Sequence, residues 1–264
     1  MKLAFRMLSG ALAAFVALTV PLTAAKAQDE APVVAAASDL QFAVTEIAAA
    51  FEAETGMAVR LSFGSTGNFA RQIREGGPFQ IFMAADEQFL FDLNRDGFAP
   101  TEGDLYAVGR IVMMVPNGST LAADGSLESL RAALDAGAIT RFAIANPEHA
   151  PYGKRAMEAL QSQGLWEKLQ PFLVLGENVS QAAQFALSGN AEGGIIAYSL
   201  ALAPEIAPLG SYELIPDDWH EPLRQRMVLL NDAGPVAQAF YAYMNEAAAR
   251  DIMERFGFVL PDGE

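Results

Sequence analysis

The chain has 264 residues, of which 52% are hydrophobic and 19% are charged. This composition excludes a disordered or fibrous protein, and the length suffices for one large domain or two lobes with separate cores. The 32 acidic residues against 17 Lys and Arg give a formal charge of −15, which makes nucleic acid and anionic membranes poor partners. Because the sequence has no cysteine, disulfides, thiolate metal sites and cysteine nucleophiles are excluded.

Residues 1–27 have the pattern of a secretory signal peptide. Lys2 and Arg6 precede an apolar run that ends near Leu22, and Ala25-Lys26-Ala27 supplies small residues at a cleavage site. The run is shorter than the roughly 20 residues that span a bilayer, although a retained anchor is the alternative. We expect cleavage after Ala27 and a periplasmic protein that is not membrane-embedded. Loss of three basic residues would take the formal charge from −15 to −18.

The rest of the chain alternates short apolar runs with amphipathic segments. Between the runs, apolar residues recur with the helical period, for example from Leu40 to Phe51 and from Val179 to Ala186. This alternation predicts strands of a parallel sheet, covered by helices on both faces. In chain order, the predicted strands are residues 32–37, 57–63, 79–84, 111–115, 141–145, 172–175, 194–198, 211–215 and 226–230.

These elements predict an α/β protein with two lobes, each a mostly parallel sheet flanked by helices. No Pro/Gly/Ser-rich linker divides the chain, so we expect two short crossings, with residues 105–115 and 226–230 as the candidates. The last amphipathic helix, which carries Phe240 and Met244 on one face, would return to the first lobe. The expected division is residues 28–110 plus 231–264 in lobe I and residues 111–230 in lobe II.

Four turns between a predicted strand and a helix carry the functional argument. A helix N-terminus presents unpaired N–H groups and a partial positive charge, so several such ends together can hold an anion without Lys or Arg. In α/β sheets, ligands bind at the carboxyl ends of strands, where these turns lie. Taken singly, each turn is explained by helix capping alone. The turns lie at residues 38–41, 64–68, 147–153 and 177–180.

The turns belong to a longer series of short motifs that occur in a fixed order along the chain. The series consists of Ala35-Ala36-Ala37-Ser38, residues 62–67 with Ala70-Arg71-Gln72-Ile73, Ala84-Ala85-Asp86, residues 147–153, Glu177-Asn178-Val179 and Gly194-Ile195-Ile196. In that order, over essentially the whole chain after the leader, it resembles the periplasmic molybdate-binding proteins of ABC transporters. The resemblance implies the two-lobed fold of type II periplasmic solute-binding proteins. It also implies an oxyanion held in the cleft by hydroxyl and backbone N–H groups, with no metal cation and no cofactor.

Carried over position by position, the resemblance names the residues around the ligand. The first lobe would contribute Ser38, Asp39 and Thr66, and the second Tyr152 and Val179, with Asp39 and Val179 acting through backbone N–H groups. Further candidates are Ser65, Gly67 and Tyr198. For Tyr198 the pattern departs from the family, because the tyrosine that follows Gly-Ile-Val in some members falls on Ala197 here.

Asp39 is the other departure, because a carboxylate facing a dianion would repel it. The interpretation we favour is that Asp39 complements the helix dipole from the first turn, with its side chain pointing away and only its N–H used. The alternative is that the carboxylate accepts a proton from the ligand, which would favour hydrogen phosphate over molybdate.

We therefore expect a monomeric, non-enzymatic protein that binds molybdate, and also tungstate, in the periplasm and delivers it to an ABC permease. Phosphate or sulfate is an alternative ligand. Molybdate, tungstate and sulfate are all dianions with acceptor oxygens only, so cavity size would have to select among these three. A second alternative is an exported hydrolase with Ser38 or Thr66 as nucleophile, for which only His149 and His220 could act as a histidine base. A third is an organic-anion binder, for which Arg71 would clamp a carboxylate.

Overall fold

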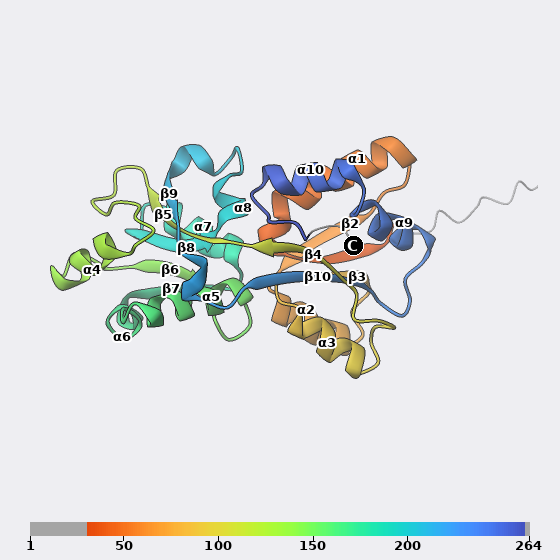
Figure 1. The fold of residues 1–264 in the computed structure, drawn as a ribbon, viewed down its shortest axis with the longest axis horizontal. Helices are drawn as coiled ribbons and strands as arrows, with labels where there is room; N and C mark the ends of the chain where they lie inside the picture. Colours follow the sequence, from red (N-terminus) through yellow and green to blue (C-terminus); the bar gives the residue numbers. More distant parts are fainter. Residues whose placement is uncertain (1–30, 262–264) are drawn as a thin grey trace, which may run out of the picture. The chain divides into compact units, whose positions relative to one another are not determined.

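The computed structural model describes residues 31–261, which belong to one compact unit (Figure 1). The predicted signal peptide, residues 1–27, lies outside the described residues. Within them, the chain forms two five-stranded sheets, with helices packed on each. No helix in this part of the chain is long and apolar enough to cross a membrane.

The first sheet has the strand order β2-β1-β3-β10-β4. Its strands are β1 (Val33–Ala37), β2 (Arg60–Gly64), β3 (Phe79–Ala84), β4 (Asp104–Gly109) and β10 (Leu223–Leu229). β1 pairs in parallel with β2 and β3, whereas β10 is antiparallel to both β3 and β4. The interior strand β1, between β2 and β3, is almost entirely buried, as expected for a continuously apolar strand covered on both faces.

The second sheet repeats this arrangement, with the order β7-β6-β8-β5-β9. Its strands are β5 (Ile111–Pro116), β6 (Phe142–Ala145), β7 (Leu173–Gly176), β8 (Gly193–Ala197) and β9 (Gly210–Leu214). β6 pairs in parallel with β7 and β8, and β5 is antiparallel to β8 and β9. Each sheet therefore has a parallel half, whose carboxyl ends are available for helix-opening turns.

The helices follow the predicted alternation. Along the part of the chain that forms the first sheet they are η1 (Ser38–Leu40), α1 (Gln41–Thr55), α2 (Thr66–Arg74), α3 (Gln88–Arg95), α9 (Pro235–Tyr243) and α10 (Ala247–Arg255). The others are α4 (Glu128–Asp135), α5 (Pro151–Ser162), α6 (Trp166–Leu169), η2 (Gln170–Phe172), α7 (Val179–Leu187), α8 (Tyr198–Ala201), η3 (Ala207–Leu209) and η4 (Asp217–Trp219). Figure 1 shows α1 and α10 on one side of the first sheet and α2 and α3 on the other.

The C-terminal helices return to the first sheet, as predicted. Phe51 of α1 packs edge-to-face against Phe240 and Tyr243 of α9, with ring centroids 5.3 and 5.4 Å apart. Such pairs contribute about 0.5–1.5 kcal/mol beyond the burial of their area. α1 is followed by Gly56, whose φ of 71° forms a left-handed C-terminal cap.

The predicted α/β class with two lobes is confirmed, with three refinements. Both sheets are mixed, because the crossing strands add antiparallel pairs to the parallel half. The run 105–115 is two strands of different sheets, β4 and β5, which meet at Arg110. The boundary at residue 230 is wrong: β10 pairs with β3 and β4, so its residues belong with the first sheet rather than with lobe II. Burial of Leu223, Met227 and Val228 in the first sheet's core explains this placement.

Gly109, the last residue of β4, allows the first crossing to pass close to a helix of the second sheet. A Cβ built on Gly109 would collide with the Tyr152 hydroxyl and lie 2.8 Å from Gln225 Nε2. No side chain larger than hydrogen fits there without moving one of these two groups.

We predict that Gly109→Ala lowers the free energy of unfolding by about 1–3 kcal/mol, the usual cost of overpacking a buried site. The matched control is Gly234→Ala, where the nearest atom to a new Cβ is 3.5 Å away and φ is −82°. Urea denaturation of both variants checks this, and equal stabilities would contradict the tight fit at Gly109.

Candidate functional site

The four strand-to-helix turns singled out in the sequence converge on one pocket. η1 follows β1 and α2 follows β2 in the first sheet, while α5 and α7 follow β6 and β7 in the second. The pocket is lined by Ala37, Ser38, Asp39, Gly64, Ser65, Thr66, Ala85, Ala150, Pro151, Tyr152, Asn178 and Val179. Its cavity volume is about 10 Å³, far below the roughly 300–1,000 Å³ of pockets for drug-sized organic molecules.

Three helices begin at the wall of this pocket. α2 starts at Thr66, α5 at Pro151 and α7 at Val179, and all three starting residues line it. The first turn of a helix has N–H groups without an intrahelical acceptor, and the macrodipole adds about half a positive charge there. Asn178 caps α7 by accepting a bond from the Gln181 N–H at 3.0 Å. The pocket thus combines several partial positive charges in a space for one small anion.

Two hydroxyl groups in the wall are oriented by backbone donors. Thr66 Oγ1 accepts the Ala85 N–H at 3.1 Å, and Ser38 Oγ accepts the Ser180 N–H at 3.3 Å. A hydroxyl that accepts a bond keeps its own proton for another acceptor. Both side chains are therefore set to donate to a ligand.

Asp39 is part of the pocket wall and of a buried polar cluster. Its side chain is 1% exposed, and Oδ2 accepts bonds from the Tyr152 hydroxyl at 2.9 Å and from Gln225 Nε2 at 2.6 Å. Gln225 Oε1 in turn accepts from the Tyr106 hydroxyl at 2.8 Å. Asp39 Oδ1 is buried and has no partner among the described residues.

The side chain of Asp39 lies buried between Tyr152 and Gln225 at the end of β1. Its expected orientation, away from a bound anion with only the N–H used, stays a prediction. Burial raises the pKa of Asp39 from 3.8 to about 6, against the lowering effect of the bonds from Gln225 and Tyr152. Burial likewise raises the pKa values of Tyr152 and Tyr106 well above the ordinary value, so both stay neutral hydrogen-bond donors.

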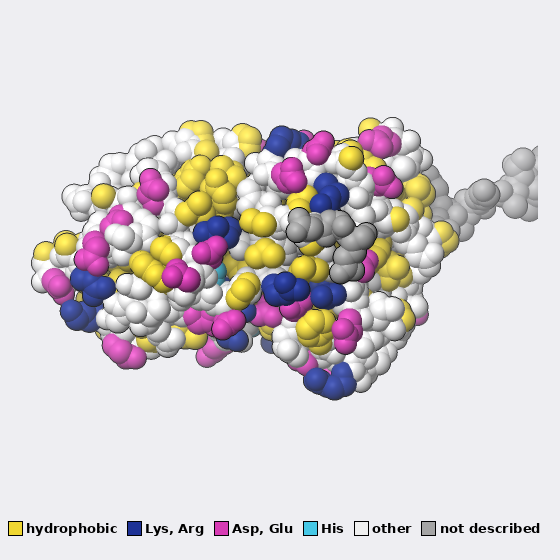
Figure 2. Space-filling model, in the orientation of Figure 1, with side chains coloured by type: hydrophobic (Ala, Val, Ile, Leu, Met, Phe, Trp, Pro, Cys, Tyr) yellow, Lys and Arg dark blue, Asp and Glu magenta, His cyan; other side chains and the backbone are white. Residues whose placement is uncertain are grey.

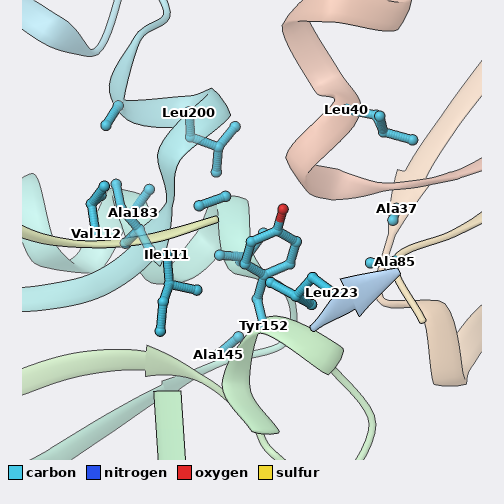
Figure 3. Close-up of a cluster of buried hydrophobic side chains, with 14 of the residues drawn as sticks. Ala37, Leu40, Ala85, Ile111, Val112, Ala145, Tyr152, Ala183, Leu200 and Leu223 are labelled. Atoms are coloured by element: carbon cyan, nitrogen blue, oxygen red, sulfur yellow. The ribbon is translucent and has the colours of Figure 1, made fainter. Parts of the chain in front are cut away.

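Tyr152 links the polar cluster to the hydrophobic core. Its ring is 3% exposed and shares a core cluster with residues from both sheets, including Ala37, Ile111 and Leu200. Figure 3 shows the ring rising from the start of α5, with the hydroxyl directed toward the gap between the segments that carry Leu200 and Leu40. Packing thus holds the hydroxyl where it meets Asp39.

Polar contacts across the pocket join turns of the two sheets. Ser180 Oγ donates to the Ser38 carbonyl at 2.9 Å, and the Gly67 N–H donates to the His149 carbonyl at 2.9 Å. The Ser65 hydroxyl lies 3.0 Å from His149 Nδ1. A second set pairs Asn68 with Glu177, and Arg155 with Asp86 at 2.9 Å. These contacts hold the turns of the two sheets together around the pocket.

The structure brings six of the eight predicted residues into the pocket wall: Ser38, Asp39, Ser65, Thr66, Tyr152 and Val179. Gly67 is outside it, because its N–H bonds to the His149 carbonyl and a Cβ there would collide with the same residue. Tyr198 is also outside, with its ring 5.8 Å from that of Tyr212 and against Gly257. The one-position shift noted in the sequence is the signal that Tyr198 has a packing role.

Sequence reasoning missed Gln225 and Tyr106, which orient Asp39 from β10 and β4. Gln225 is 0% exposed, but it stands between Arg224 and Arg226, just before the predicted strand 226–230, so nothing in the local sequence indicates its role. Arg71 is exposed and outside the wall, which removes the arginine clamp of the organic-anion alternative. The other nearby cation, Arg155, is paired with Asp86 and Glu158.

A family model described as bacterial extracellular solute-binding protein matches residues 32–259. The chain belongs to this family. As a solute-binding protein it is 36% identical to the molybdate-binding protein ModA of Azotobacter vinelandii over 93% of this chain and 96% of that one. It is 33% identical to ModA of Rhodobacter capsulatus, over 94% of each chain. Among solved structures, the periplasmic molybdate-binding protein of Azotobacter vinelandii superposes with a TM-score of 0.79 at 31% identity, covering 88% of this chain and 100% of that one.

We predict that Asp39→Asn changes the pH dependence of stability of this solute-binding protein. Because the folded pKa of Asp39, about 6, exceeds its ordinary value of 3.8, the folded state binds more protons between these values, and stability falls as pH rises through them. The free energy of unfolding of the variant, relative to wild type, should rise by up to about 3 kcal/mol between pH 4 and pH 7 and then stay level. Thermal or urea denaturation at several pH values measures this, and parallel pH profiles would contradict it.

Proposed function

We propose that the protein binds molybdate, and also tungstate, as the solute-binding component of an ABC transporter. The observation that carries this proposal is the small pocket in which three helix N-termini and the hydroxyls of Ser38 and Thr66 meet. Such a site offers donors on several sides, which suits an anion whose oxygens are all acceptors. The relatives named as molybdate-binding proteins support the choice of ligand.

The formal charge of −15 does not oppose this function. Screening over roughly 8 Å at physiological ionic strength removes most distant repulsion, whereas donors about 2.9 Å from the ligand act at full strength in a dry pocket. On the face shown in Figure 2, acidic side chains are scattered among Lys and Arg rather than gathered in one patch. The partial positive charges at the helix starts therefore attract the ligand despite the net charge of the chain.

Binding would couple to closure of two lobes. We assign residues 31–109 and 223–261 to one lobe and residues 110–222 to the other, a division that follows the two sheets and the crossings near Arg110 and η4. Turns from both lobes line the pocket, so a bound ion adds contacts that only the closed form can make. The closed form, as a periplasmic monomer released by cleavage after Ala27, would then deliver the oxyanion to a membrane permease.

Ligand-induced stabilisation is the first test. At a concentration about 1,000 times Kd, molybdate or tungstate should raise the melting temperature by about 10 °C, because a ligand bound only by the native state stabilises it by about 4 kcal/mol. Sulfate and phosphate at the same concentration should cause little change. Differential scanning calorimetry measures this, and a larger shift with phosphate or sulfate would transfer the function to that anion.

Removal of single hydroxyl donors is the second test. Ser38→Ala and Thr66→Val should each weaken molybdate binding about 10- to 100-fold, the loss of one hydrogen bond to a charged group. Ser162→Ala, which removes an exposed hydroxyl at the end of α5, is the control and should bind like wild type. Isothermal titration calorimetry gives the three dissociation constants. Unchanged affinity in both pocket variants would place the ligand elsewhere.

The contact between Ser65 and His149 bears on the alternative that the protein is a hydrolase. Neither Ser38 nor Thr66 bonds to a histidine within residues 31–261; instead, Ser65 lies 3.0 Å from His149. Glu177, which would orient the imidazole, is 3.7 Å from Nε2 and mostly exposed, so the group lacks the buried acid of a hydrolytic triad. We assign Ser65 and His149 to closure of the pocket. Hydrolysis of an activated ester that disappears in Ser65→Ala would reverse this assignment.

A further inference from the structure

The acidic wall of the pocket poses a problem for an anion site. Asp39 is 1% exposed and lines the pocket, and its Oδ1 is buried without a partner among the described residues. A fully deprotonated tetrahedral dianion has only acceptor oxygens, so an ionised Asp39 could neither donate to it nor accept from it. Burial of two such negative groups together without a proton or a cation between them is strongly unfavourable.

The hydrogen bonds around Asp39 fix where a proton would be. The Tyr106 hydroxyl donates to Gln225 Oε1, which turns the amide nitrogen of Gln225 toward Asp39 Oδ2 and the Tyr152 oxygen, at 2.6 and 3.0 Å. Tyr152 has one proton, and it is directed to Asp39 Oδ2 at 2.9 Å. Because Oδ2 already accepts two bonds, a proton on this carboxyl belongs on Oδ1, the oxygen with no partner.

The residues packed around Asp39 offer no cation to neutralise it. α5 presents Tyr152; its Arg155 is held by Asp86 and Glu158, and its Lys154 is exposed. β4 presents Tyr106, and its Asp104 is exposed at the start of the strand. α7 has no titratable side chain within Val179–Leu187. The charged or titratable groups on the other neighbouring elements are Glu46 with Arg255 and Glu54 with Tyr243 for α1, Glu52 of α1, Tyr198 of α8, Arg60 of β2, and Arg224 and Arg226 with Glu87 for β10.

Asp39 is in none of the ion pairs formed within residues 31–261. Neutralisation of its carboxylate beside an anion therefore has to come from a proton. Burial raises the pKa of Asp39 to about 6, so the fold makes protonation of this carboxyl easier than in water, and a bound dianion would favour it further.

We propose that the pocket binds its oxyanion together with one proton, which Asp39 takes from solvent, holds on Oδ1 and donates to a ligand oxygen. The inference rests on the proposed function and adds the proton as a second bound species. The carboxylate gains one proton, the ligand keeps all its electrons and oxygens, and no covalent bond to the ligand forms. Asp39 thereby becomes a specificity residue, since it selects an anion with an unprotonated oxygen that can accept the hydrogen bond from Oδ1.

Affinity should then depend on pH in one direction. Above the pKa of the free pocket, each further pH unit makes protonation tenfold less favourable, so the Kd for molybdate should rise about tenfold per pH unit between pH 7 and pH 9. At pH 8, complex formation should take up close to one proton per ligand. At pH 5, where Asp39 is already mostly protonated, the uptake should be small.

Isothermal titration calorimetry of the full mature chain with sodium molybdate tests this. At pH 8, the observed enthalpy is plotted against the ionisation enthalpy of several non-anionic buffers, and the slope gives the protons taken up. Infrared difference spectra of the same titration report the stretching band of a protonated carboxyl group. The expected results are a slope near one and the appearance of that band.

Variants identify the group that takes up the proton. Asp39→Asn carries a permanent donor, so its uptake should be near zero and its Kd independent of pH, with binding at pH 8.5 at least tenfold tighter than in wild type. Asp135→Asn, the same change at an exposed carboxylate, should behave like wild type. If Asp39→Asn fails to fold, the wild-type slope and infrared band still decide the question.

The possible failures are distinct. Tight molybdate binding at pH 8 without proton uptake overturns this inference and leaves the proposed function intact. Phosphate binding that is tighter than molybdate binding, with no uptake from solvent, means that the ligand supplies the proton, and it overturns both. No binding of molybdate, tungstate, sulfate or phosphate at pH 5.5 or pH 8 also overturns both.

Discussion

The site depends on one geometric constraint: parallel strands of two sheets must end at the same place. In each sheet the parallel half lies beside antiparallel crossing strands, and the turns after β1, β2, β6 and β7 all line one small pocket. A single helix start would be an ordinary capped end. Several of them around one pocket favour a bound anion, because their partial positive charges lie close to the same point.

The buried polar cluster at the pocket gives this arrangement its orientation. The cluster draws on both sheets: Tyr106 and Gln225 come from β4 and β10, and Tyr152 comes from α5. The bonds to Asp39 therefore form only when the two sheets are correctly positioned against each other. Tyr106 donates to Gln225, and Gln225 and Tyr152 both donate to Oδ2 of Asp39. Only Oδ1 of Asp39 is left without a partner in this cluster. A buried network with one open position is a place for a ligand, because only a ligand or solvent can complete it.

Much of the site could be predicted from the sequence, because its residues stand in turns between predicted strands and helices. Ser38, Thr66, Tyr152 and Val179 stand at helix starts that follow apolar strands, and the same residues appear in the pocket wall. What failed was the assignment of side chains whose role depends on a distant partner. The burial of Asp39 was not foreseen, because nothing within its own segment indicates Gln225, which lies 186 positions away in the chain. Gly67 was taken for a ligand group, whereas its N–H serves a loop of the other sheet.

The sequence by itself determined the α/β class, the alternation of elements and the helix-opening turns, because hydrophobic period and capping residues act within a few positions of the chain. It also determined the family through the order of its motifs. Only the tertiary structure decided that β10 lies in the first sheet, that Tyr198 packs away from the pocket and that Asp39 is buried. Those outcomes depend on pairing and desolvation between segments far apart in the chain, and the free energy of such contacts is set by the assembled core rather than by local residue pattern.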